Sequence, residues 1–322
     1  MEDTYFDEID NSNSESCSDN NPSIELSNTE SEDDILGPNL DIFDDYFLSK
    51  SGEDKWFKSP INTTGRISSP CIIKNKPGLT IQARRIENKI DSLDLFMDDA
   101  LKKKILKYSN QYALLHNSSW KQITMSEFNR FIGLLILLGV YKAKNEPIRD
   151  IWNKEDGRPV FSKSMSVNRF ESILRYLRFD DTINRDRQDK GAAIKEVFES
   201  FRRKLCSGIV PSENLTVDEQ LVNFFGRCSF KTYIPSKPGK FGIKIWVLCD
   251  AKTGYCLNQS IYFGKIQKNS PPEKNLGKNV ALNLINTCMV KLDGRNITTD
   301  NFFSSLSLSQ ELLKKKLLWL EL

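Results

Sequence analysis

Apolar residues change their spacing at Pro211, and this change limits what the chain can fold into. Across residues 93–208 they recur every three or four positions, which predicts a mainly helical region. Beyond Pro211 they alternate at every second position over 214–224, 241–249 and 255–263. Alternation over such lengths is typical of β-strands. The chain is therefore expected to place a helical region before a strand-rich one.

A second group of patterns follows the third predicted strand. Apolar residues at helical spacing cover 282–289, a short strand covers 296–299 and ends at Asp300, and a leucine-rich helix covers 304–316. The order of three strands, helix, strand and helix predicts a mixed α/β fold. Its second part corresponds to the start of an RNase H-like layer, and that layer is incomplete.

The charge of the chain is divided as sharply as its periodicity. Residues 1–54 carry 17 acidic residues and one basic residue, and few apolar side chains. Such a segment buries too little surface to offset its ordering entropy, so we expect disorder. The remainder carries 45 basic and 26 acidic residues, which suits a polyanionic partner, with an ordinary solvated surface as the alternative. The expected regions are a disordered acidic tail with a basic linker (1–92), a helical region (93–210) and a partial α/β region (211–322).

A single histidine and scattered cysteines exclude several classes of site. His116 rules out zinc sites of the H-E-x-x-H type and leaves a Ser-His-Asp triad one candidate base. The seven cysteines form no C-x-x-C pair, and the polar N-terminus is not a signal peptide, which favours a reducing compartment. The longest apolar run, 131–140, is about half of a membrane span, so no membrane partner is expected.

Two aspartates stand where adjacent strands could bring them together. Asp218 lies in the first predicted strand and Asp300 ends the fourth, and these strands are neighbours in an RNase H-like sheet. Carboxylate oxygens suit hard divalent cations, which can activate an attacking oxygen in phosphodiester cleavage. Glu219 and Asp250 are weaker candidates. From the residues alone, a structural role at a strand end or turn is the more frequent one.

The most basic stretch of the chain, 227–278, lies between these aspartates and holds ten Lys and Arg against two acids. Basic side chains with an interleaved aromatic, on a loop stiffened by Pro and Gly, suit phosphate contact and base stacking. An ordinary lysine-rich hairpin is an equal alternative. The candidate DNA-binding residues are Arg227, Lys231, Tyr233, Lys237, Lys240 and Lys244.

Several segments have an unusual and specific composition. They are LTVDEQL (215–221), FGR (225–227), YIPSKPGKFGIKIW (233–246), TGY (253–255) and TDNFFSS (299–305), with FIGLLILLGV (131–140), IW (151–152) and FESILRYLRF (170–179) upstream. Together they resemble the piggyBac transposase family, over roughly residues 90–316. The run at 233–246 is long, so chance is a poor explanation.

The resemblance implies an RNase H-like catalytic core with a three-aspartate metal site, preceded by a helical dimerisation and DNA-binding region. Asp218 matches the family's first catalytic aspartate and Asp300 its second, both as ligands of Mg²⁺. The basic stretch matches a segment expected to lie against double-stranded transposon-end DNA. Family members excise an element flanked by TTAA and join it to a new TTAA target, and a homodimer in the nucleus is expected.

The end of the chain departs from the family pattern. The third catalytic aspartate and a cysteine-rich zinc domain are expected beyond Leu322, and residues 317–322 do not continue as family members do. We therefore expect a C-terminally truncated transposase fragment in which the edge of the fourth strand is open. The alternative is a domesticated module that binds DNA or dimerises without catalysis.

We expect no autonomous transposition by the 322-residue chain. Two divalent ions carry four positive charges, and Asp218 and Asp300 neutralise half of that charge. Losing a third ligand should lower the rate by roughly 10²–10⁴. A plasmid excision assay checks this expectation, and recovery of donor sites with a restored TTAA would contradict it.

Overall fold

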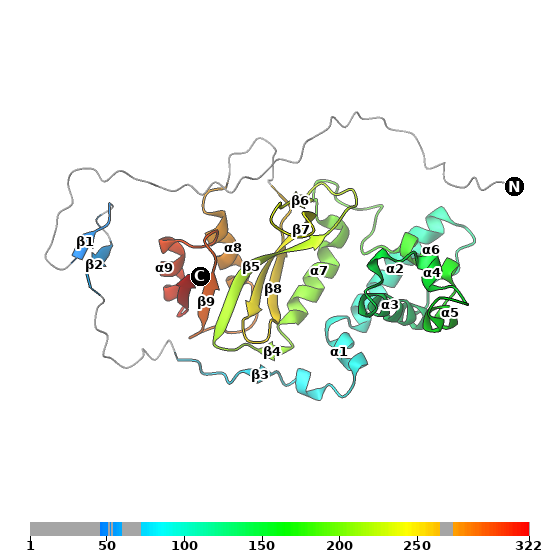
Figure 1. Cartoon of the computed structure of the whole chain (residues 1–322), viewed down its shortest axis with the longest axis horizontal. Coiled ribbons are helices and arrows are strands. Elements are labelled where there is room, and N and C mark those ends of the chain that lie inside the picture. The colour runs from blue at the N-terminus through cyan, green and yellow to red at the C-terminus, as the bar shows by residue number, and fades with distance from the viewer. Residues whose placement is uncertain (1–45, 51, 53, 60–71, 265–272, 322) are drawn as a thin grey trace, which may run out of the picture.

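The structure is a computed structural model that describes residues 46–50, 52, 54–59, 72–264 and 273–321. These residues form a helical unit and an α/β unit that contains the main sheet (Figure 1). The mixed fold expected from the periodicity is therefore confirmed. Most of the acidic tail, residues 1–45, lies outside the described part, so its disorder stays a prediction.

The helical unit is built around buried aromatic rings. Its helices are α1 (Lys89–Phe96), α2 (Asp99–His116), α3 (Met125–Val140), α4 (Ile148–Ile151), α5 (Pro159–Ser164) and α6 (Val167–Tyr176). Asp98, Thr124 and Ser166 cap α2, α3 and α6, each by accepting a hydrogen bond from the N–H three residues on. Phe131 and Phe170 are fully buried, with ring centroids 5.1 Å apart. Among the described residues, no helix is both long and apolar enough to cross a membrane.

An ion pair between Arg169 and Glu127 joins α6 to the start of α3. The Arg169 guanidinium donates to both Glu127 carboxylate oxygens, at 2.8 and 2.7 Å, and lies 4.5 Å from the centroid of the Trp120 ring. The hydrogen bond from Arg169 lowers the pKa of Glu127. A bidentate pair between partly buried groups holds the two helices in a defined orientation.

The main sheet places the first and fourth predicted strands side by side. Its strands are β5 (Asn214–Asn223), β6 (Thr232–Tyr233), β7 (Phe241–Asp250), β8 (Cys256–Ile261), β9 (Asn296–Thr299) and β10 (Leu318–Glu321). Their order is β10-β9-β5-β7-β6, and β8 also pairs with β7. β5 is parallel to β9 and antiparallel to β7. This neighbouring of β5 and β9 is what the RNase H-like reading of the sequence predicts.

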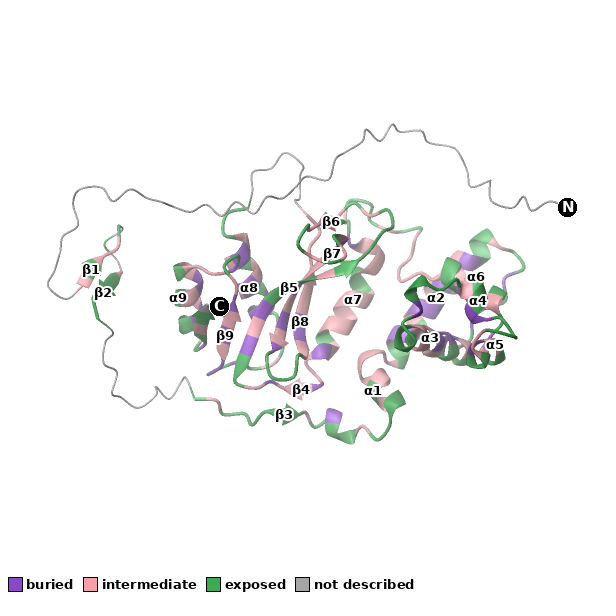
Figure 2. Cartoon of the chain, in the orientation of Figure 1, coloured by how far each residue is buried: buried purple, intermediate pink, exposed green. Residues whose placement is uncertain are grey.

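Helices α8 (Leu276–Asn286) and α9 (Leu306–Lys314) contribute to the core of the α/β unit. Buried positions recur along β5 and on the helices beside it (Figure 2). Leu215, Val217 and Leu248 of the sheet belong to one buried cluster with Leu284 of α8 and Leu308 of α9. Helix α7 (Ala192–Leu205) packs against β8. The side of β5 that carries Leu215 and Val217 is therefore covered.

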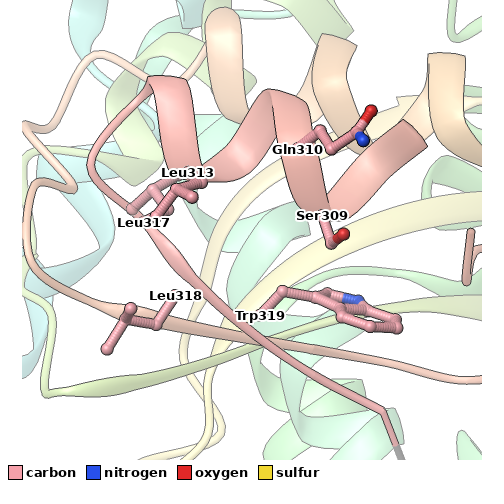
Figure 3. Close-up of a pocket in the computed structure, with 6 residues that line it drawn as sticks. All are labelled: Ser309, Gln310, Leu313, Leu317, Leu318 and Trp319. Atoms are coloured by element: carbon pink, nitrogen blue, oxygen red, sulfur yellow. The ribbon is translucent and has the colours of Figure 1, made fainter. Parts of the chain in front are cut away.

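Strand β10 corrects one expectation, because the edge of the fourth strand is not open. It is paired in parallel with β10 along its length. The chain turns at Lys316, whose φ is 63°, and Leu317 then enters the core with 2% exposure. Trp319 follows on the same side and donates from Nε1 to Thr299 Oγ1 at 2.9 Å. Side chains that point alternately into the core and away from it are typical of a strand. Figure 3 shows this segment passing α9, with a small pocket between them.

The described part of the expected tail and linker, 1–92, contains paired strands. These are the hairpin β1 (Tyr46–Leu48) and β2 (Lys55–Phe57), and β3 (Gly78–Leu79), which pairs with β4 (Ile209–Val210). The contact continues at Thr80, whose N–H donates to the carbonyl of Gly208 at 3.2 Å. The backbone of β4 finds its hydrogen-bond partners in this segment, which docks it on the α/β unit.

Arg295 joins the N-terminal ends of the parallel strands β5 and β9. Its side chain is 1% exposed, and it donates to the carbonyls of Pro211 and Ser212, both at 2.9 Å, and of Lys291 at 3.0 Å. Burial lowers the pKa of this guanidinium. Next to it, the N–H of Asn296 donates to the Glu213 carbonyl at 2.9 Å. These bonds set which residue of β9 faces which residue of β5.

Replacing this cation tests its role in the register. Arg295→Met keeps the length of the side chain but leaves three buried carbonyls without their donor, so we expect a loss of roughly 2–4 kcal/mol in the free energy of unfolding. Urea denaturation followed by circular dichroism measures it. Arg203→Met, at an exposed position of α7, is the matched control and should change stability by less than about 0.5 kcal/mol. Equal midpoints for the two variants would contradict the role assigned to Arg295.

Candidate metal centre

Strand register brings the two predicted aspartates together. In the parallel pair of β5 and β9, Val217 lies opposite Thr299. The next residues along the chain are Asp218 and Asp300, which therefore lie side by side. One carboxylate oxygen from each of these aspartates and one from Glu219 lie within 4.8 Å of one another. The structure thus gathers three carboxylates from two adjacent strands, and we call this group the acidic centre.

Asp300 is the most constrained member of the acidic centre. Its Oδ1 atom is buried and has no hydrogen-bond partner among the described residues. Burial raises the pKa of the Asp300 carboxyl, and the negative charges of Glu219 and Asp218 raise it further. Its backbone carbonyl accepts from the hydroxyl of Ser304 at 2.7 Å, which fixes the turn that follows β9. A buried, unpaired carboxylate oxygen beside two further carboxylates is costly unless a cation joins them.

Glu219, which the sequence indicates only as a weaker candidate, lies with the two aspartates in the acidic centre. Alternation along a strand places residues 218 and 219 on opposite faces, which argues against both reaching one site. The site lies where β9 ends, and Asp300 interacts with both carboxylates there. The Nζ of Lys237 lies 3.4 Å from Glu219 Oε1. An acidic pair opposite the end of a neighbouring strand is the signal that could have singled out Glu219.

Asp250, the other weaker candidate, has a structural role. It is 1% exposed and accepts hydrogen bonds from the N–H of Ser212 at 2.6 Å and the hydroxyl of Thr253 at 2.6 Å. Burial acts to raise its pKa, but these hydrogen bonds outweigh that effect and the pKa is lowered. With its oxygens already satisfied, Asp250 closes the turn between β7 and β8 and lies outside the acidic centre.

The donor set of the acidic centre fits a hard divalent cation. All three side chains offer carboxylate oxygens, the ligand type that Mg²⁺ and Mn²⁺ prefer. The unpaired Oδ1 of Asp300 is a second observation that fits a cation at this centre, because a bound cation would give this oxygen a partner. Asp218 is exposed, so the centre is open to solvent on one side. The residues present could therefore hold a cation that also contacts a bound substrate.

The predicted DNA-binding residues differ in exposure: Tyr233, Lys237 and Lys244 are half-buried, and the other three are exposed. Lys237 reaches Glu219, as described above, and Lys244 lies with its Nζ 4.0 Å from the centroid of the Trp246 ring. Further along the same loops, Tyr233 packs on Phe241 with ring centroids 4.7 Å apart. The three exposed residues are Arg227, Lys231 and Lys240. Lys237 is thus placed beside the carboxylates, and contact of any of these six residues with DNA stays a prediction.

The turn after Asp300 carries two aromatic residues that the sequence reading did not single out. Phe303 is buried and Phe302 is 47% exposed. The turn lies so close to α8 that a Cβ at Gly277 would come within 2.2 Å of the Phe302 carbonyl oxygen. Glycine at this position is therefore required for the approach. An aromatic pair directly after a strand-ending aspartate is the signal that could have identified this feature.

The fold and the acidic centre define a class: an RNase H-like α/β core with carboxylates on adjacent strands, preceded by a helical unit. The model of the family described as Transposase IS4 matches residues 90–320. The chain belongs to this family, and the resemblance found in its motifs is confirmed. Transposases of this DDE type generally use a divalent metal ion.

Relatives and a solved structure agree with this assignment. The human PiggyBac transposable element-derived protein 3 is 29% identical over 266 residues, which cover 80% of this chain and 42% of that protein. The human PiggyBac transposable element-derived protein 2 is 25% identical over 155 residues, covering 48% and 26%. A cryo-EM structure of a piggyBac transposase synaptic complex with hairpin DNA matches with a TM-score of 0.71 and 30% identity, covering 77% of this chain and 53% of that one. The chain spans about half the length of these proteins or less.

Neutralising Asp300 should stabilise the metal-free protein. A carboxyl whose pKa is raised on folding stabilises the fold below its unfolded pKa, and this contribution is lost as the pH rises through the raised value. At pH 7 the ionised group is therefore a cost, and Asp300→Asn should raise the melting temperature by on the order of 2 °C. The difference should shrink towards about pH 4.

Added Mn²⁺ should reverse this order, because the cation stabilises the wild type and the variant lacks one of its ligands. Differential scanning fluorimetry at the two pH values, with and without Mn²⁺, measures both effects. Asp156→Asn, at an exposed position in the helical unit, is the control. Identical melting temperatures for wild type and Asp300→Asn, with equal shifts by Mn²⁺, would exclude a cation at this centre.

Proposed function

We propose that this chain provides the metal-holding and DNA-holding core of a piggyBac-type transposase, which cleaves and rejoins phosphodiester bonds of double-stranded DNA at TTAA sites in the nucleus. The observation that carries the proposal is the convergence of Asp218, Glu219 and Asp300, with Oδ1 of Asp300 buried and unpaired. Membership of the transposase family supports it. A divalent cation is the simplest group that such a centre would hold.

Asp218 and Asp300 would hold Mg²⁺, with Glu219 as a third carboxylate. When bound, Mg²⁺ supplies activation of the attacking oxygen and stabilisation of the leaving one. The chain's own contribution is to hold three oxygens together at one end of β9 and to leave one side open to DNA. The pairing of β5 with β9 holds Asp218 and Glu219 on a strand and Asp300 directly after one, which favours a constant geometry.

The loop 224–240 supports the DNA part of the proposal because it connects the exposed cations to the acidic centre. Lys237 contacts Glu219, whereas Arg227, Lys231 and Lys240 are exposed on the same stretch. A phosphate held by these side chains would lie close to the carboxylates. Such contacts orient the backbone of a duplex without reading its sequence.

A binding module without catalysis is the second candidate, and the surface of the helical unit favours it. Helices α2 and α3 expose apolar side chains near their ends: Leu114, Leu115, Ile136 and Val140, at 43–68% exposure. Exposed apolar side chains of this kind can serve in self-association, which agrees with the expected homodimer. In this case DNA binding would survive replacement of Asp218 and Asp300.

The binding part is tested by fluorescence anisotropy with a labelled duplex that contains TTAA. We expect the affinity to fall steeply between about 50 and 200 mM salt, with a log–log slope of roughly −0.9 for each neutralised phosphate. Lys231→Ala and Lys240→Ala should each reduce the slope by about 1 and weaken binding to all sequences alike. Lys291 is also exposed and lies before β9, and Lys291→Ala should leave the affinity and the salt slope unchanged. Absence of binding at low salt would remove the DNA-binding function.

A further inference from the structure

Phe302 forms the outer layer of an aromatic stack beside the acidic centre. Its ring lies parallel to that of Trp246, with centroids 5.5 Å apart and an angle of 10° between the planes. Trp246 is 3% exposed, whereas Phe302 is 47% exposed. The indole therefore forms the buried base of the stack, and the phenyl ring presents part of its surface to solvent.

Two contacts hold the Phe302 ring in place. Phe303 is 1% exposed and packs edge-on against both rings, at centroid distances of 5.0 Å from Phe302 and 5.5 Å from Trp246. The backbone of the turn rests on Gly277 of α8, as described above. A single exposed phenylalanine is ordinary on a protein surface. Phe302 differs because its ring is stacked in parallel on a buried indole and its backbone is packed against α8. These contacts fix the plane of the ring, and a fixed plane favours the stacking of a planar ligand.

The surroundings of the stack suit a nucleotide better than a protein side chain. The ammonium of Lys244 lies 4.0 Å from the centroid of Trp246 and 5.2 Å from that of Phe302. The acidic centre is also near, because Phe302 follows Asp300 by two residues and Trp246 lies opposite Glu219 in the pairing of β5 with β7. A flat ring with a cation and a carboxylate centre close to it suits a nucleotide, because the base can stack on the ring while cations hold the phosphate.

We infer that Phe302 stacks on an unpaired nucleobase of the DNA strand whose phosphate lies at the acidic centre. The inference rests on the proposed function and names the surface that holds the strand end. A base next to a cleaved phosphate loses stacking with its neighbours, and an aromatic side chain offsets that loss. Phe302 is then a positioning residue: it holds the strand end so that the phosphate stays beside Asp218 and Asp300.

The test uses the 322-residue chain and two duplexes, one blunt and one with a four-nucleotide TTAA overhang that carries 2-aminopurine in place of adenine. Wild type should quench the 2-aminopurine fluorescence on binding. Phe302→Ala should abolish the quenching and weaken binding of the overhang duplex by about 5- to 100-fold, with less than a twofold change for the blunt duplex. Phe302→Trp should retain the quenching.

Two further variants keep the outcome clear. Phe302→Leu preserves apolar contact with Trp246 but lacks an aromatic face, so it should fold and still fail to quench. Leu306→Ala removes a neighbouring side chain of similar exposure, 43%, and should behave as wild type. Undiminished quenching by Phe302→Ala or Phe302→Leu, with duplex binding intact, would overturn the stacking alone. Failure of the wild type to bind either duplex at low salt would remove the DNA-binding function and the stacking with it.

Discussion

The position of the guanidinium of Arg295 is the constraint on which the rest of the α/β unit depends. It is buried between the segments that lead into β5 and β9 and is held by carbonyl oxygens. A cation in such a place is tolerated only where several dipoles face it. Because β5 and β9 are parallel, a shift of one residue here would move Asp300 to the other side of the sheet. The geometry of the acidic centre therefore depends on contacts at the opposite end of the strands.

The acidic centre shows how a fold can hold a group that destabilises it. Oδ1 of Asp300 is buried without a partner, and its carboxyl faces two further negative charges. The Nζ of Lys237 lies 3.4 Å from Glu219 Oε1, so this lysine of the loop 224–240 offsets part of the negative charge. The strands that carry the carboxylates are covered by α8 and α9 and paired on both sides. The stability of these strands keeps the three carboxylates together, although the repulsion between their negative charges favours separation.

Much of this could be predicted from the sequence, because spacing of apolar residues reports on burial. It predicted the order of strands and helices after Pro211 and the neighbouring of Asp218 and Asp300. Two features, the role of Arg295 and strand β10, were missed, and Glu219 was placed among the weaker candidates, each for a physical reason. Glu219 lies on the other side of the strand from Asp218 by alternation, Arg295 satisfies its charge with backbone groups that no motif reveals, and β10 depends on a reversal at Lys316 that its leucine-rich sequence hides. Each depends on contacts between segments far apart in the chain.

Electrostatics also links the two parts of the proposed function. A DNA phosphate that approaches three carboxylates is repelled unless cations lie between them, and Lys237 supplies only one positive charge there. A divalent cation at Asp218 and Asp300 would change the sign of the interaction and free Lys237 from Glu219 for contact with the backbone. Metal and DNA would then each raise the affinity for the other, since coupling of two ligands is reciprocal. The contact between Lys237 and Glu219 is thus the physical basis on which DNA binding and metal binding would depend on each other.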